Sequence, residues 1–225
     1  FFYMYYPRYE FGSHTNEEKI SRVSDVIIGD VLYRGIKNLN INEKDKEGLL
    51  KKVELLKQSV RLDLEHENDF SYKTALQVMM TNIKKCFYSD NEPKVWIEKT
   101  TSTEFYALDI IKTFPNAKFI HITRDPRDNW GSLKSGWKAK YKNVNDELKA
   151  LMQSLLERSK LGLEFAKHNQ EIIGRDKYLV VRYEDLTSNP EHYMKIIAAF
   201  IGIDYTDNLL KPTTFGYSWE GNNFD

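Results

Sequence analysis

The sequence is poor in cysteine and has no long apolar run, with Cys86 as its single thiol. One thiol cannot close an intrachain disulfide, so we interpret Cys86 as a small buried apolar residue in a reducing compartment. No stretch of about 18 apolar residues is present, and the aromatic start FFYMYYP is too short for a spanning helix or a signal peptide. We therefore expect a soluble, cytoplasmic protein without a membrane partner.

An excess of one charge is also lacking, because 33 basic residues balance 33 acidic ones. Without a global positive field, binding to nucleic acid is not expected, and any anion site must be local. The five histidines, at positions 14, 66, 121, 168 and 192, show no ligand spacing with cysteine or paired carboxylates. We accordingly expect no metal site.

The 225 residues, 41% of them hydrophobic, suffice for one α/β domain over 1–225. Residues 1–90 have mostly helical patterns. Thr15 and Glu18 form a capping box that predicts a helix to about Gly29, and apolar residues recur every three to four positions in 42–62 and 70–88. Core packing explains these patterns, and the same helices are candidates to line a substrate pocket.

From Pro93 onward the hydrophobic period changes. Short β-prone runs occur at 95–97, 118–123 and 178–181, and helical patterns separate them. The helical patterns cover 105–114, the segment from Pro126, 146–169 and 190–201. Alternating strands and helices predict an α/β fold, in which helices flank a parallel sheet.

In such a sheet, ligands bind beyond the carboxyl ends of the strands. Arg124 follows the predicted strand 118–123, and Ser132 lies eight positions later, in the second turn of a helix that starts near Pro126. A guanidinium and a hydroxyl in this arrangement can hold one anion. Considered alone, the charged cluster at 124–128 fits surface ion pairs equally well.

The segments EKTTSTEFYALDIIKTFPNAKFIHITRDPRDNWGSLKSGW, LVVRYEDLTSNP and FIGI resemble the central region of sulfotransferases that use 3′-phosphoadenosine 5′-phosphosulfate (PAPS), in particular carbohydrate and bacterial types. This resemblance implies a P-loop-NTPase-like sheet, with residues 94–225 as the nucleotide-binding core. It implies transfer of a sulfonate from PAPS to a hydroxyl or amine of a small molecule, sugar or peptide. It assigns the nucleotide's 3′-phosphate to Arg124 and Ser132, and the adenine to Tyr183.

The segment Glu98-Lys99-Thr100 resembles the E-K-[ST] segment of carbohydrate-type members, whose lysine points at the transferring group. Lys99 is therefore the predicted catalytic residue. A fixed ammonium suits sulfonate transfer, because negative charge spreads over the sulfonyl oxygens and the departing phosphate. Strand alternation places Glu98 on the opposite face, where a structural role is expected.

Two parts of the family pattern are not found in the sequence. The PxSGTT loop that cradles the 5′-phosphosulfate is absent, and we expect it, with the first strand, to lie upstream of Phe1. The histidine base of cytosolic-type members is replaced by Thr101. Glu10 and His14 are the nearest substitutes, but they are better interpreted as a surface carboxylate and a loop histidine. We assign no general base.

Two other functions remain open. A nucleotide or small-molecule kinase would use similar strand ends but needs GxxxxGK[ST], which the sequence lacks. A non-catalytic sulfotransferase-like binding module would keep the strands and lose the phosphosulfate loop.

Overall fold

The computed structural model describes residues 14–88, 93–99, 102–140, 147–214 and 216–218. Its contacts divide the chain into two compact units. The helical unit contains the residues up to Thr103 together with Thr213–Trp219, and the α/β unit contains Glu104–Pro212 and the last residues of the chain. The assignment of one domain to the whole chain stays a prediction.

The helical unit begins with a long helical segment, which two further helices follow. A short hairpin from the far end of the chain completes the unit. The elements are α2 (Asn16–Ser21), η2 (Arg22–Asp30), α3 (Val31–Lys37), α4 (Glu43–Glu65), α5 (Tyr72–Phe87), β3 (Thr213–Thr214) and β4 (Tyr217–Ser218). The capping box is formed as predicted: Glu18 N donates to Thr15 Oγ1 at 3.2 Å, and Thr15 N donates to Glu18 Oε2 at 2.8 Å.

The first helical segment does not end near Gly29, as the sequence suggested, but continues through η2 into α3. Val23, Ile28 and Ile36 are buried along this segment, which packs on α4. A helical glycine costs about 0.5–1 kcal/mol, and burial of even one such apolar side chain exceeds that. Packing therefore outweighs the stop signal at Gly29.

Helices α4 and α5 pack on each other and supply much of the core of this unit. Their caps are Asn42 and Ser71, whose side chains accept from the backbone N–H groups three residues on. The apolar period in both helices corresponds to burial, with Val53, Leu56, Val60, Leu64, Ala75, Leu76 and Met79 all almost inaccessible to solvent. Cys86, near the end of α5, is only partly buried.

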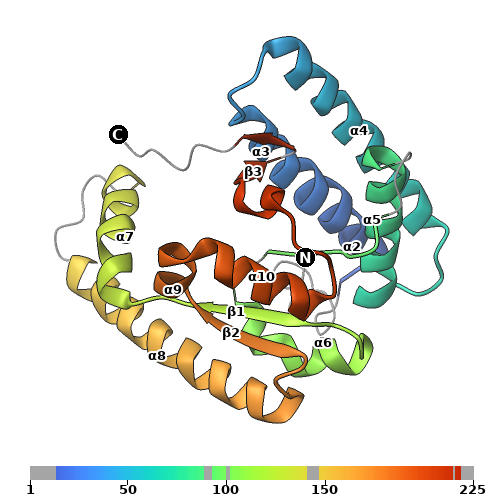
Figure 1. The fold of residues 1–225 in the computed structure, drawn as a ribbon. Coiled ribbons are helices and arrows are strands. Elements are labelled where there is room, and N and C mark those ends of the chain that lie inside the picture. Colours follow the sequence, from blue (N-terminus) through green and yellow to red (C-terminus); the bar gives the residue numbers. More distant parts are fainter. Residues whose placement is uncertain (1–13, 89–92, 100–101, 141–146, 215, 219–225) are drawn as a thin grey trace. The chain divides into compact units, whose positions relative to one another are not determined.

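The α/β unit contains a parallel pair of strands and the helices around it. It starts within η3 (Thr103–Tyr106), whose first residue belongs to the helical unit. Its other elements are α6 (Ala107–Thr113), β1 (Phe119–Thr123), α7 (Pro126–Lys140), α8 (Glu147–Ile173), β2 (Tyr178–Arg182), α9 (Tyr183–Ser188), α10 (Pro190–Ile201) and η4 (Asp207–Leu210). The register pairs Phe119 with Tyr178 and Thr123 with Arg182. Figure 1 shows α8 running along this pair. The predicted α/β class is confirmed.

A buried polar network joins β1, β2 and α8. The phenol of Tyr178, 1% exposed, lies 2.8 Å from His121 Nδ1 and accepts from Asn169 Nδ2 at 3.3 Å. Asn169 also donates to the Glu104 carbonyl at 2.8 Å. Because the Tyr178 oxygen accepts from Asn169, we assign the phenol O–H as the donor to His121 Nδ1. Nδ1 is then the acceptor, and the imidazole proton is on Nε2.

The third predicted strand, at 95–97, is not formed. Residues 93–99 are described without regular secondary structure, and Val95, Trp96 and Ile97 are 41%, 38% and 67% exposed. A strand needs a neighbouring strand to satisfy its backbone groups, and the described residues offer none beside this segment. Intrinsic β propensity alone is therefore insufficient here.

The helices in the described ranges differ from membrane-spanning helices. None of the helices found there has both the length and the apolar character that a bilayer span requires.

Candidate functional site

The carboxyl ends of β1 and β2 lie side by side, because the register pairs their last residues, Thr123 and Arg182. The residues that follow the two strands, Arg124 and Tyr183, are therefore neighbours. The guanidinium carbon of Arg124 lies 4.5 Å from the centre of the Tyr183 ring, and both side chains are exposed. A cation stacked on an aromatic face at this distance is an attractive pair.

Helix α7 starts at Pro126, as predicted, two residues after Arg124. Asp125 caps the helix: its Oδ1 accepts from Arg127 N at 2.8 Å. The side chain of Arg127 forms an ion pair with Asp125 at 2.6 Å. These hydrogen bonds from Arg127 lower the pKa of Asp125 to about 2. The surface ion pair that the sequence left open is thus real for Asp125 and Arg127.

Arg124 itself is arranged differently. Besides stacking on Tyr183, its Nη2 donates to the Asp128 carbonyl at 3.4 Å, a long and weak hydrogen bond. The guanidinium lies close to the start of α7, where helix N–H groups lack intrahelical acceptors and the helix dipole favours anions. An incoming phosphate can replace the weak carbonyl contact with a charge-assisted one.

Ser132 lies six residues after Pro126 in α7. Its backbone is therefore in the second turn of the helix, where the spacing predicted it. The position of its side chain is outside the described part of the structure. A contact of Ser132 with a shared anion stays a prediction.

The site also contains a residue that the sequence did not single out. Glu184, the second residue after β2, accepts a hydrogen bond from Asp125 N at 2.8 Å. This bond is the first cause of a lowered pKa of Glu184, and nearby Arg182 adds to it. The parallel register would have indicated Glu184, because it brings the residues after Thr123 and Arg182 together.

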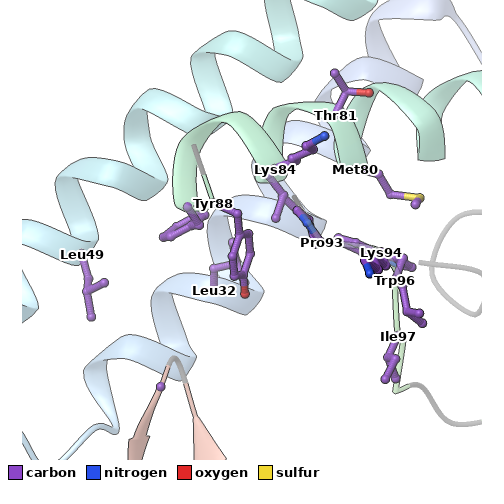
Figure 2. A pocket seen from close by; sticks show the side chains of 14 residues that line it. Leu32, Leu49, Met80, Thr81, Lys84, Tyr88, Pro93, Lys94, Trp96 and Ile97 are labelled. Carbon is purple, nitrogen blue, oxygen red and sulfur yellow. The ribbon is translucent and has the colours of Figure 1, made fainter. Parts of the chain in front are cut away.

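Lys99 belongs to the helical unit and is exposed. Two residues before it, Ile97 lines an apolar pocket of about 880 Å³ in the same unit (Figure 2). The pocket is bordered by α5, by 93–97 and by Gly216, and its lining includes Met80, Phe87, Tyr88, Trp96, Lys84 and Lys94. The helices before Tyr88, which the sequence predicts as candidates for the acceptor side, contribute to this pocket, and no sequence pattern indicated the cavity itself.

Of the three positions that the sequence raised for a general base, the structure describes only His14. His14 lies 3.5 Å from Glu18 at the start of α2, which fits a local ion pair. Glu10 and Thr101 lie outside the described residues. Over the described ranges, no group of three or more His, Cys, Asp or Glu side chains has the arrangement of a metal site.

Comparison with known proteins decides the family. Residues 32–207 match the family model described as the sulfotransferase family. This chain belongs to the sulfotransferase family. This match confirms the resemblance to sulfotransferases found in the sequence. The matched range contains Lys99, Arg124, Ser132 and Tyr183, whose roles stay predictions.

Curated proteins that are similar to this chain include two protein-tyrosine sulfotransferases. A protein-tyrosine sulfotransferase of Drosophila melanogaster is 29% identical over 106 residues, which are 47% of this chain and 20% of that protein. Protein-tyrosine sulfotransferase 2 of Gallus gallus is 27% identical over 155 residues, or 68% of this chain and 40% of that protein. The chain thus spans less than half the length of either relative. No solved structure matches it.

Proposed function

We propose that this sulfotransferase uses PAPS as its donor and transfers the sulfonate to a hydroxyl or amine acceptor. The observation that carries the proposal is the placement of Arg124 against Tyr183 at the carboxyl edge of the β1–β2 pair. A cation and an aromatic ring side by side suit a phosphorylated nucleoside, whose phosphate and base need both. The family match supports the same reading.

In this proposal, Arg124 binds the 3′-phosphate with its guanidinium, and Ser132 adds a hydroxyl donor from the second turn of α7. The Tyr183 ring, 38% exposed, keeps surface free for the adenine. The α7 N-terminus contributes a favourable dipole to the phosphate.

Transfer itself breaks the bond between sulfur and the bridging phosphate oxygen and forms a bond between sulfur and the acceptor atom. The products are the sulfated acceptor, adenosine 3′,5′-bisphosphate and the proton that the acceptor loses. Lys99 stabilises the negative charge that develops on the transferring group and the leaving phosphate. It is proposed as the catalytic residue, and the proton acceptor is left unassigned.

The pocket of the helical unit is the proposed acceptor side. Its lining combines aromatic rings with aliphatic side chains, and its two charged members are Lys84 and Lys94. Ile97 connects the pocket to Lys99 over two residues, roughly 7 Å of extended chain. Both relatives are named for protein tyrosine, which makes a peptide tyrosine the first acceptor to examine.

The proposal is tested by incubating the full protein with sulfur-labelled PAPS and separate acceptors: a tyrosine peptide, its phenylalanine counterpart and an amino sugar. We expect label on an acceptor that has the hydroxyl or amine and none on the phenylalanine peptide. Phosphate transfer from ATP and magnesium in place of sulfonate transfer would support a kinase. Tight binding of adenosine 3′,5′-bisphosphate without any transfer would support a binding module.

A further inference from the structure

Glu184 contacts the backbone at the point where the candidate phosphate site begins. Its Oε1 accepts from Asp125 N at 2.8 Å, and the two side chains are only 28% and 27% exposed. That N–H belongs to the peptide group joining Arg124 to Asp125. A hydrogen bond to it therefore fixes the ψ angle of Arg124 and the direction in which the chain enters α7.

The residue before Glu184, Tyr183, acts on the other end of Arg124. Tyr183 supports the guanidinium with its ring, whereas Glu184 holds the peptide that follows the Arg124 Cα. Two consecutive residues of one strand end thus restrain the main chain and the side chain of the same arginine. A bidentate contact to a phosphate depends on this kind of fixed geometry.

The charge of Glu184 argues against a direct role in anion binding. Its carboxylate and that of Asp125 both have lowered pKa values, so both are ionised at neutral pH. Two negative charges beside a phosphate site oppose binding of the phosphate. What Glu184 contributes must come from its hydrogen-bond acceptor and its length.

We infer that Glu184 is a positioning residue, whose carboxylate oxygen holds the Arg124–Asp125 peptide so that Arg124 faces the nucleotide's 3′-phosphate. This inference rests on the proposed function. It predicts that the acceptor atom matters and that the charge does not. Glutamine keeps the acceptor without the charge, leucine of similar size keeps neither, and aspartate keeps the charge on a side chain one methylene too short.

The test compares Glu184→Gln, Glu184→Leu and Glu184→Asp by titration calorimetry with adenosine 3′,5′-bisphosphate and adenosine 5′-phosphate. The measured quantity is the ratio of the two affinities, which isolates the 3′-phosphate contact. We expect Glu184→Gln to keep or raise the wild-type ratio, and Glu184→Leu to lower it about tenfold. Glu184→Asp should lower it as well, and this variant decides the matter if the leucine variant does not fold.

Glu191 on α10 supplies the matched control, because this exposed carboxylate pairs with Lys195. Glu191→Gln and Glu191→Leu should leave the ratio unchanged. A ratio that falls with Glu184→Gln but not with Glu184→Asp would overturn the inference in favour of a charge effect. Equal ratios in all Glu184 variants would overturn it too. A wild-type protein without any 3′-phosphate preference would instead refute the proposed function.

Discussion

Arg124 and Tyr183 are the first residues after two paired parallel strands, and the guanidinium of one lies 4.5 Å from the ring centre of the other. Their proximity follows from the register of β1 and β2. The paired strands therefore place a cation and an aromatic ring at one edge of the sheet, where α/β proteins bind ligands.

Replacement of the Tyr183 ring tests this pair. Tyr183→Phe keeps the aromatic face and should retain the preference for a 3′-phosphate. Tyr183→Leu removes the aromatic face. This variant should weaken the preference for a 3′-phosphate about two- to fivefold, which corresponds to the energy of an exposed cation–π contact. Calorimetry with the two adenosine nucleotides measures both effects. Identical ratios in the phenylalanine and leucine variants would show that the ring does not support Arg124.

Lys99 is predicted to act on the rate and not on nucleotide binding. Lys99→Ala should lower kcat about 10²- to 10³-fold, as expected for loss of one group that stabilises transition-state charge. The affinity for adenosine 3′,5′-bisphosphate should stay within about twofold of wild type, because this product lacks the sulfonate. Lys73→Ala, on an exposed position of α5 outside the pocket lining, is the control for loss of a positive charge in the same unit. An unchanged kcat in Lys99→Ala would remove Lys99 from the mechanism.

The sequence predicted the fold where local signals and packing agree. The helix starts predicted at Thr15 and near Pro126 are confirmed, and α10 spans the predicted residues 190–201. It was wrong at Gly29, where an apolar face continues through the glycine. It was also wrong at 95–97, because strand formation depends on a partner that propensity does not reveal.

For the site, motif spacing identified Arg124 and the start of α7, but not Glu184. Its hydrogen bond to Asp125 joins residues far apart in the sequence, and only the parallel register reveals it. Carboxylates after a strand are common, so residue type alone gave no reason to select this one. The stacking of Arg124 on Tyr183 was inaccessible for the same reason.

The partly buried His121 predicts a pH dependence of stability. Burial lowers the pKa of His121, and the opposing effect of Glu104 is smaller. The unfolded chain therefore takes up a proton near pH 6.5 while the folded one does not, so stability falls as the pH drops below about 6.5. The melting temperature should decrease between pH 7.5 and 5.5.

His121→Asn tests this assignment, since its amide oxygen can accept from Tyr178 without titrating. This variant should lose less of its melting temperature over the same pH interval than the wild type. His168→Asn, on an exposed position of α8, should behave like the wild type. The same decrease in His121→Asn and wild type would show that another group is responsible.

Loss of the Asn82 side chain is expected to destabilise the helical unit. This residue is 2% exposed, accepts from Ser59 Oγ at 2.5 Å and donates to Asp63 Oδ2 at 2.7 Å. Asn82→Ala leaves both partners unsatisfied and should reduce the free energy of unfolding by about 1–3 kcal/mol, as measured in urea. Gln77→Ala, exposed on the same helix, should change it by less than about 0.5 kcal/mol. Equal effects would contradict a buried network.

Nucleotide selectivity tests the central claim most directly. The measurement is the melting temperature of wild type and Arg124→Ala with adenosine 3′,5′-bisphosphate or adenosine 5′-phosphate at equal concentration. We predict a clearly larger rise with the bisphosphate in the wild type, and a loss of most of that difference in Arg124→Ala. Equal rises with the two nucleotides in the wild type would contradict the account.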